Sequence, residues 1–250
     1  MKSYNLQSYN LQYFKSGNGP LLIYLPGMEG TARLFYKQEP SLSKSFTVVS
    51  LPLRHVAPFN YEDHLSDLLT VFEKEKAENA TIVAESFGGT VALQFALRHP
   101  DRIRKLVLIN TFPYFRRRFR FYLGWVLLPL TFVKLGNAVR EFFYRVAMGM
   151  DGLAKEDIDN LCECSFSHGY KTSRQRMALI KDYDVRNRLN EIKIPVTIIA
   201  CKRDKLIPSV KEARFMASRM LNARVIELPE HGHTPLVSRD FLLSRILDAG

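Results

Sequence analysis

Three residues of this sequence are of the types that together activate a serine hydroxyl, and they occur in the order Ser86, Asp204, His233. A serine hydroxyl is a weak nucleophile at neutral pH. It needs an imidazole to take its proton, and a carboxylate to orient the imidazole and stabilise its cation. Each of the three stands just past a short apolar run of the kind found in buried strands. The set therefore predicts nucleophilic chemistry with Ser86 as the attacking group, His233 as the base and Asp204 as the acid that orients it.

Ser86 lies where two patterns meet, because an apolar run over 80–84 precedes it and apolar positions at helical spacing follow over 91–99. The local motif Ala84-Glu85-Ser86-Phe87-Gly88 departs from the nucleophile elbow G-x-S-x-G only at its first glycine. A strand, a tight turn and a helix would hold the Ser86 hydroxyl above the sheet, with the N-terminal N–H groups of the helix aimed at it. This geometry favours a nucleophile.

Other residues of the same types offer alternatives for the base and the acid. His231 precedes His233 by two positions and is the alternative base, and Asp182 and Asp184 are the alternative acids. Each of the three favoured residues could also be an ordinary turn or capping residue. Their joint placement behind three separate strands favours the set with Asp204 and His233.

The elements that must position these residues alternate between strands and helices, which is typical of an α/β fold with a mostly parallel twisted sheet flanked by helices. We expect strands over 11–14, 21–25, 46–49, 80–84, 105–109, 196–200 and 223–228, and helices over 31–42, 61–77, 91–99, 209–221 and 236–247. Ligands of such sheets bind beyond the carboxyl ends of the strands, which is where the three residues fall.

The alternation lapses over 112–188, where helical stretches occur without a strand-like run. We therefore expect a core domain made of residues 1–111 and 189–250, with residues 112–188 inserted as a helical cap over the carboxyl edge of the sheet. Aromatic residues of this cap could line a substrate pocket, with helix packing as the alternative. The candidates for the pocket are Phe112, Phe115, Tyr122 and Trp125.

Four loops together resemble those of the α/β-hydrolase fold serine hydrolases of the esterase and lipase kind. Residues 25–31, 85–89, 203–208 and 232–233 are similar to the oxyanion loop, the nucleophile elbow, the acid loop and the histidine loop of that family. The resemblance covers nearly the whole chain outside the expected cap. It implies an eight-stranded, mostly parallel sheet, although the N-terminus is short of a full first hairpin, so that the first strand is expected to be missing or irregular.

The resemblance also implies two backbone N–H donors that hold negative charge on a carbonyl oxygen during acyl transfer, those of Met28 and Phe87. Pro26 has no N–H, which leaves Met28 as the better donor in its loop and Glu29 as its competitor. Asn110 occupies a position where some family members carry the acid, and its amide removes that alternative.

The activity that the resemblance implies is hydrolysis of a small-molecule acyl ester by a carboxylesterase, through a Ser-His-Asp triad and an acyl-enzyme that water then cleaves. No metal or organic cofactor is implied. The same scaffold and triad also serve acyltransferases and thioesterases, and some members of the fold bind ligands without catalysis. These alternatives stay open at the level of sequence.

The charge of the chain does not indicate a nucleic-acid partner. The formal net charge of the 250 residues is +11, but lysine and arginine are spread along the chain and no nucleic-acid-binding motif occurs. The one dense basic cluster is Arg116 to Arg120, ahead of the apolar stretch 121–133. A solvated helix face is the simpler interpretation of it, and weak contact with a lipid surface is the alternative. The oligomeric state is left open.

Cellular location is indicated only indirectly. The N-terminus has no apolar segment of the kind found in secretory signals, and the stretch 121–133 is shorter than the roughly 20 residues that span a bilayer. The three cysteines, two of them at C-x-C spacing, fit free thiols better than a disulfide framework or a structural zinc site. We therefore expect a soluble, cytoplasmic protein.

Overall fold

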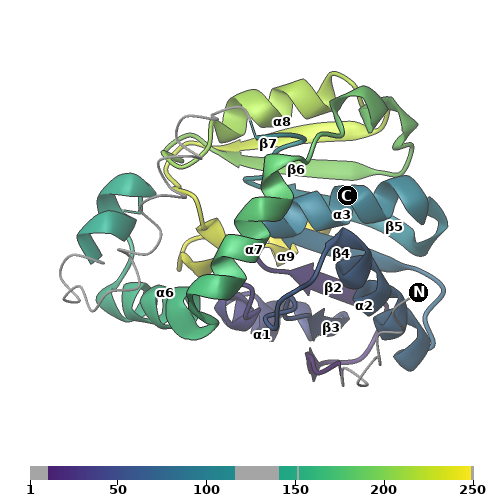
Figure 1. Cartoon of the computed structure of the whole chain (residues 1–250), viewed down its shortest axis with the longest axis horizontal. Helices are drawn as coiled ribbons and strands as arrows, with labels where there is room; N and C mark the ends of the chain where they lie inside the picture. Colours follow the sequence, from purple (N-terminus) through teal and green to yellow (C-terminus); the bar gives the residue numbers. More distant parts are fainter. Residues whose placement is uncertain (1–10, 116–140, 151, 249–250) are drawn as a thin grey trace.

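One twisted sheet forms the centre of the molecule (Figure 1). The computed structural model describes residues 11–115, 141–150 and 152–248. In this part of the chain seven strands occur in the order β1-β3-β2-β4-β5-β6-β7, and all neighbours are parallel except β1 and β3. The strands are β1 (Phe14–Ser16), β2 (Leu21–Leu25), β3 (Thr47–Ser50), β4 (Ala80–Glu85), β5 (Ile103–Ile109), β6 (Val196–Cys201) and β7 (Ala223–Leu228). The α/β class is confirmed, with seven strands described where the resemblance implied eight.

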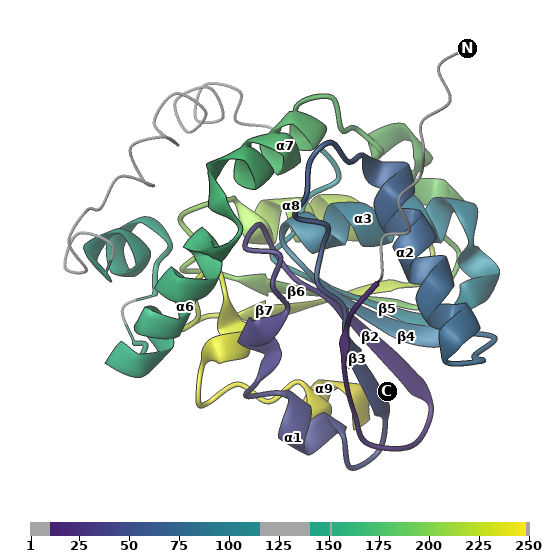
Figure 2. The ribbon, with the colours of Figure 1, turned by 60° about the horizontal axis from the view of Figure 1, so that its bottom comes forward.

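Helices cover both faces of the sheet. The longer ones are α2 (Tyr61–Lys74), α3 (Phe87–Arg98), α6 (Lys155–Ser167), α7 (Gly169–Lys181) and α8 (Ser209–Ala217). Short helices are η1 (Arg33–Phe35), α1 (Glu39–Leu42), η2 (Pro100–Arg102), η3 (Phe143–Ala147), η4 (Arg186–Glu191), η5 (Pro235–Val237) and α9 (Ser244–Asp248). Figure 2 shows α2, α3 and α8 on one side of the sheet and α1 and α9 on the other.

Successive residues of the central strands point to opposite faces, so each strand contributes to two apolar layers. Ile23 and Ile82 belong to the layer that includes residues of α2, α3 and α8, while Leu22 and Val83 belong to the layer that includes Leu42 of α1 and residues near the C-terminus. Burial on both faces explains why these strands read as continuous apolar runs rather than as an alternating pattern.

The sequence prediction is wrong about the extent of two helices. The segment 31–42 is not one helix but η1 and α1, because Ala32 has a positive φ of 61° and Pro40 enters the first turn of α1. The predicted helix over 236–247 is replaced by η5 and α9. The physical reason is the buried side chain of Gln38, which donates to the carbonyl oxygens of Leu236 and Phe241 over 2.7 and 3.0 Å. Backbone groups of this segment thus bond to a distant side chain instead of to other backbone groups within a helix.

In the described part of the chain between β5 and β6 the regular elements are helices, apart from an isolated bridge between Tyr114 and Asp184. Its helix α6 is tied to the core by the buried carboxylate of Asp157, which accepts a hydrogen bond from Lys37 over 2.6 Å. None of the helices in the described ranges has both the length and the apolar character needed to cross a bilayer. The division into a core of residues 1–111 and 189–250 and a cap of residues 112–188 stays a prediction.

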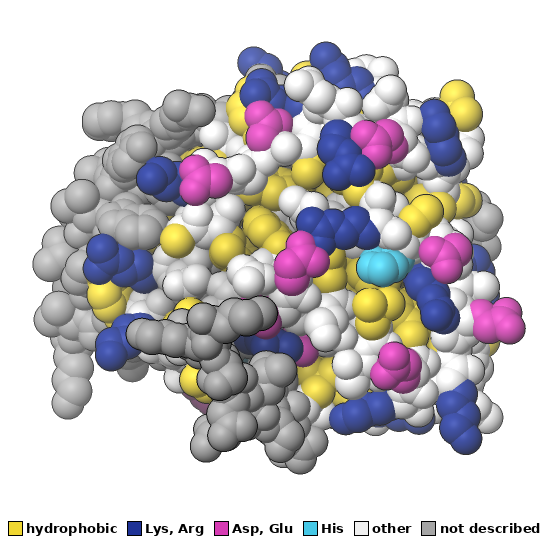
Figure 3. Space-filling view, turned by 45° about the vertical axis from the view of Figure 1, so that its right-hand side comes forward, with side chains coloured by type: hydrophobic (Ala, Val, Ile, Leu, Met, Phe, Trp, Pro, Cys, Tyr) yellow, Lys and Arg dark blue, Asp and Glu magenta, His cyan; other side chains and the backbone are white. Residues whose placement is uncertain are grey.

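The surface carries charges of both signs. On the face drawn in Figure 3, lysine and arginine side chains are interspersed with aspartate and glutamate rather than gathered into a stripe. Elsewhere in the described part of the chain, exposed charges are paired, as in the contacts of Arg214 with Glu227 and of Arg188 with Glu191. On the face in Figure 3 the positive net charge does not take the form of a basic stripe.

Candidate active site

Ser86 occupies the sharp turn between β4 and α3. Its backbone is strained, with φ 50° and ψ −116°, a combination that residues other than glycine rarely adopt. The end of β5 holds this conformation, because the Ser86 N–H donates to the carbonyl oxygen of Ile109 over 2.9 Å and the Thr111 hydroxyl donates to the carbonyl oxygen of Ser86 over 2.7 Å. The sequence-predicted order of strand, turn and helix at Ser86 is therefore observed.

The turn also depends on close approach of α3 to β2. A Cβ added to Gly88 would lie 2.5 Å from the carbonyl oxygen of Pro26 and 2.6 Å from that of Leu25, which is too near for any side chain. Glycine at this position of the motif is therefore required for packing. Ala84, which replaces the first glycine of the motif, is fully buried in β4.

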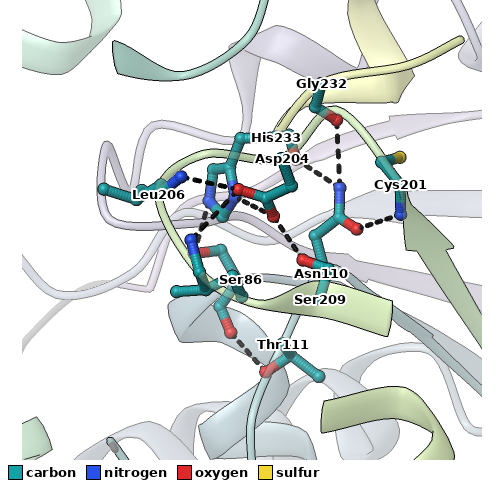
Figure 4. Close-up of polar contacts among 10 residues, drawn as sticks. Ser86, Asn110, Thr111, Cys201, Asp204, Leu206, Ser209, Gly232 and His233 are labelled. Carbon is teal, nitrogen blue, oxygen red and sulfur yellow. Dashed lines mark hydrogen bonds and ion pairs between the residues drawn. The ribbon is translucent and has the colours of Figure 1, made fainter. Parts of the chain in front are cut away.

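The imidazole of His233 joins Ser86 to Asp204 (Figure 4). Its Nε2 lies 3.0 Å from the Ser86 Oγ, and its Nδ1 lies 2.8 Å from the Asp204 Oδ2. With the proton on Nδ1, the ring donates to Asp204 and leaves Nε2 free to accept the serine proton. Three side chains that are up to 147 residues apart in the sequence thus form one hydrogen-bonded chain.

Donors on the loop after β6 hold the Asp204 carboxylate. Oδ1 accepts the backbone N–H groups of Leu206 and Ile207 over 2.9 and 3.1 Å. Oδ2, the oxygen that faces His233, also accepts the hydroxyl of Ser209 at the start of α8. These bonds fix the direction in which the carboxylate faces the imidazole.

The loop that carries His233 is held from two sides. Asn110, just past β5, donates its side-chain amide to the carbonyl oxygens of His233 and Gly232 over 2.7 and 3.2 Å. The backbone N–H of His233 donates to the carbonyl oxygen of Met148, which follows η3. The position of the imidazole therefore depends on both the sheet and the segment between β5 and β6.

The electrostatics of the site favour a histidine that binds a proton readily. Burial by itself lowers the pKa of His233, but the charge of Asp204 and the hydrogen bond to it raise the pKa, and the pKa of His233 lies above 6.5. His233 is 3% exposed, so the Asp204 charge is little screened by solvent. This arrangement stabilises the imidazolium that forms when the serine proton is transferred.

Glu85 lies next to Ser86 but its carboxyl turns to Tyr24, whose hydroxyl donates to Oε2 over 3.2 Å. Burial raises the pKa of Glu85 to about 8, so the side chain is mostly neutral at pH 7. A neutral carboxyl agrees with an interior position at the end of β4, and it places no full negative charge beside the serine.

The loop after β2 lies against the serine. A Cβ added to Gly27 would be 3.4 Å from the Cβ of Ser86 and 4.0 Å from its Oγ. The next residue is Met28, in a turn closed by a hydrogen bond of 3.1 Å from the Gly30 N–H to the Gly27 carbonyl oxygen. The N–H of Phe87, the first residue of α3, is one of those for which a helix provides no acceptor. Both predicted oxyanion donors thus belong to segments that adjoin Ser86.

The alternative base and acids do not contact the serine chain. His231 lies 3.3 Å from Asp240 and packs its ring edge-on against Phe241. Asp184 forms an exposed ion pair with Arg186. Asp182 is exposed at the end of α7. Only His233 and Asp204 are brought to Ser86 among these candidates.

Of the predicted pocket residues, Phe112 and Phe115 pack edge-on against each other with ring centroids 5.4 Å apart. They line a cavity of about 10 Å³, the size of one water molecule, beside the Leu206 and Ile207 segment that holds Asp204. Their role toward a substrate stays a prediction. Tyr122 and Trp125 lie outside the described residues, and so does the basic cluster 116–120 with the apolar stretch behind it.

Sequence reasoning missed several residues that support this site. Thr111 and Ser209 carry small hydroxyls just past β5 and at the start of α8, and their position at the carboxyl edge is a signal that could have found them. Arg176 had no such signal, because it lies in the middle of the charged helix α7. Only the three-dimensional fold brings it to the loop that contains Met28.

Comparisons with known proteins agree with the fold. A family model described as alpha/beta hydrolase fold matches residues 20–240. A protein of Azorhizobium caulinodans that bears the name of a carbamate hydrolase is 24% identical over 252 residues, covering 94% of both chains. A pimeloyl-[acyl-carrier protein] methyl ester esterase of Nitrosomonas europaea is 26% identical over 234 residues, covering 89% of this chain and 92% of the relative.

Among solved structures, the enol-lactonase from Burkholderia xenovorans LB400 superposes with a TM-score of 0.82 over 95% of both chains, at 21% identity. At that identity the superposition supports the fold alone. The family match spans far more than half of the 250 residues and includes Ser86, Asp204 and His233. The chain therefore belongs to the alpha/beta hydrolase fold family.

Proposed function

We propose that this protein is a serine hydrolase that cleaves carboxylic esters through an acyl-enzyme on Ser86. The observation that carries the proposal is the position of the His233 imidazole, 3.0 Å from the Ser86 Oγ and 2.8 Å from the Asp204 carboxylate. In this geometry His233 removes the serine proton as the hydroxyl attacks the ester carbonyl, and returns the proton to the departing alcohol. Water then attacks the carbonyl carbon of the acyl-enzyme. His233 takes a proton from the water and returns it to the Ser86 Oγ as the acid is released.

The negative charge that develops on the carbonyl oxygen needs donors on the side of Ser86 away from His233. We assign this task to the N–H groups of Met28 and Phe87. Phe87 opens the twelve-residue helix α3, whose N-terminal dipole also favours negative charge at this point. Loss of one such donor in other hydrolases costs about 3 kcal/mol of transition-state stabilisation.

The relatives support an ester as the substrate. Several proteins that match about nine tenths of this chain are pimeloyl-[acyl-carrier protein] methyl ester esterases, at 24 to 27% identity. We propose small esters of carboxylic acids as the substrate class, with a short alcohol such as methanol as the leaving group. The cap of residues 112–188 would shape the acyl side of the pocket, with Phe112 and Phe115 on its described wall.

A series of p-nitrophenyl esters from acetate to palmitate tests this function, together with methyl esters of dicarboxylic acids and a p-nitrophenyl carbamate. We expect hydrolysis of short to medium acyl esters by the wild type and a loss of about a million-fold in kcat in Ser86→Ala, as for other serine triads. Hydrolysis that persists unchanged in Ser86→Ala would contradict the proposal. A trial with added alcohol distinguishes hydrolysis from acyl transfer by its product, because transfer yields a new ester.

A further inference from the structure

A buried arginine from α7 reaches the loop that contains the proposed oxyanion donor. Arg176 is 1% exposed, and its guanidinium donates to four backbone carbonyl oxygens. Nη1 contacts the carbonyl oxygens of Met28 and Glu29 over 2.7 and 3.1 Å. Nη2 contacts those of Leu53 and Arg54, in the segment after β3, over 3.4 and 3.1 Å. One side chain therefore joins α7 to two loops at the carboxyl edge of the sheet.

These contacts act on a turn whose peptide planes are rigid. The carbonyl group of Gly27 shares its plane with the Met28 N–H, and this plane is held by the bond from the Gly30 N–H. The following two planes carry the carbonyl groups of Met28 and Glu29, and both are held by Arg176. All three planes of the turn are thus fixed, including the one that aims the Met28 N–H.

Gly30 shows that the turn is built around the guanidinium. Its φ is +71°, and a Cβ added to it would lie 2.1 Å from Nη2 and 2.3 Å from Cζ of Arg176. Its carbonyl oxygen accepts the N–H of Leu53 over 2.9 Å, which ties the turn to the same segment that Arg176 holds. A side chain at this position would displace Arg176 or the turn.

The chemistry of arginine suits this task. A guanidinium has five donors in one plane, so a single side chain can satisfy several carbonyl oxygens that point to one place. An apolar residue would leave those carbonyl groups buried and unpaired, and a lysine ammonium would reach fewer of them. The guanidinium charge also opposes the effect of burial on the neighbouring Glu29, whose pKa is raised by burial and lowered in part by Arg176.

We propose that Arg176 is a positioning residue for the oxyanion site: through the carbonyl groups of Met28 and Glu29, helix α7 sets the orientation of the Met28 N–H. This inference rests on the proposed function and extends it, because it makes the segment between β5 and β6 part of the machinery that stabilises the transition state. Its consequence is that loss of the guanidinium lowers kcat more than it raises KM, since an oxyanion exists only in the transition state.

The test compares Arg176→Met and Arg176→Lys with Arg174→Met, a control on the same helix. Arg174 is exposed, and its guanidinium contacts the Tyr170 hydroxyl rather than the turn. With a p-nitrophenyl ester, we expect kcat to fall about 10- to 100-fold in Arg176→Met with KM changed less than about threefold, a smaller fall in Arg176→Lys and none in the control. In Arg176→Ala, millimolar guanidinium should restore part of kcat, and ammonium should restore less.

Amide hydrogen exchange gives a readout that does not depend on activity. The N–H groups of Gly30 and Leu53 should exchange faster in Arg176→Met than in the wild type or in Arg174→Met, because both are bonded within the turn that Arg176 holds. If Arg176→Met does not fold, Gly30→Ala and Arg176→Lys carry the same comparison.

The failures are distinguishable. A wild-type protein that cleaves no ester in the series contradicts the proposed function, and the exchange experiment then still tests whether Arg176 holds the turn. Folded Arg176 variants with wild-type kcat, or with unchanged exchange at Gly30 and Leu53, would overturn the inference while leaving ester hydrolysis intact.

Discussion

The side-chain amide of Asn110 donates a hydrogen bond of 2.7 Å to the backbone carbonyl oxygen of His233. The same amide group reaches the carbonyl oxygen of Gly232, and its Oδ1 accepts the N–H of Cys201 over 2.8 Å. One buried side chain thereby connects the ends of β5 and β6 with the loop that carries the proposed base. The position that could have held an acid in this fold holds instead a residue that fixes the histidine loop.

Replacement of Asn110 by glycine should loosen that loop. Glycine tolerates the positive φ of 43° at this position, so Asn110→Gly removes the side-chain bonds without adding backbone strain. Buried groups left unpaired should lower the free energy of unfolding by about 1–3 kcal/mol. A misplaced imidazole should lower kcat by about tenfold. Urea unfolding and steady-state kinetics measure both, with Asn222→Gly as the control, since Asn222 makes an exposed bond to Lys193. Equal kcat in the two variants would refute the role.

Replacement of Asp204 by asparagine should be far more damaging. Asparagine keeps the shape of the side chain but removes the charge that stabilises the imidazolium, and it can present a donor to Nδ1 and so favour the wrong tautomer. We expect kcat to fall by about a thousand- to ten-thousand-fold, as in serine proteases with the same change. Steady-state kinetics on the best ester of the series measures the loss. A loss below tenfold would mean that another group serves as the acid.

The pH dependence of kcat/KM should reflect His233. The base must be neutral to accept the serine proton, so activity falls as pH falls through its pKa. Burial lowers the pKa of His233, but Asp204 raises it, and the pKa lies above 6.5 overall, which places the midpoint of the acidic limb above pH 6.5. A pH–rate profile from pH 5 to 9 tests this. A midpoint well below 6.5, or a flat profile, would be inconsistent with the geometry around the imidazole.

Glu85 should make the protein less stable as pH rises. In the fold, burial raises the pKa of Glu85 to about 8 from the ordinary 4.5, so the folded protein holds more protons than the unfolded chain between these values. Its contribution is therefore fully present below pH 4.5 and is lost as pH rises through 8. Glu85→Gln cannot ionise, so its stability relative to the wild type should increase from pH 5 to pH 9. Urea unfolding measures this difference, with the exposed Glu78→Gln as the control. A difference independent of pH would contradict the buried position of the carboxyl.

The strands and the site loops could be predicted from the sequence because their signals are local. Runs such as 21–25 and 106–109 are apolar and buried at every position, and burial on both faces of a parallel sheet demands that pattern. Ser86, Asp204 and His233 each follow such a run. Because the carboxyl ends of parallel strands lie at one edge of the sheet, the sequence alone predicts that the three residues lie close together. The order of the four loops along the chain supports the resemblance to the α/β-hydrolase fold more strongly than any single motif does.

The supports of the site could not be predicted because they are long-range contacts of polar side chains with backbone groups. Arg176 bonds to a carbonyl group 148 residues away, and Gln38 bonds to one 198 residues away. Neither residue type marks such a role in sequence, since arginine and glutamine are ordinary on helix surfaces. The predicted closing helix failed for the same reason, because a tertiary partner took over backbone groups that local propensity assigns to a helix.

The most direct test of the central claim is labelling of the folded protein with a fluorophosphonate, followed by intact mass measurement and peptide mapping. We expect one adduct, located on Ser86, no adduct in Ser86→Ala, and slow labelling in His233→Ala, because the imidazole activates the hydroxyl. A folded wild-type protein that takes up no label, or an adduct on a different residue, would contradict it.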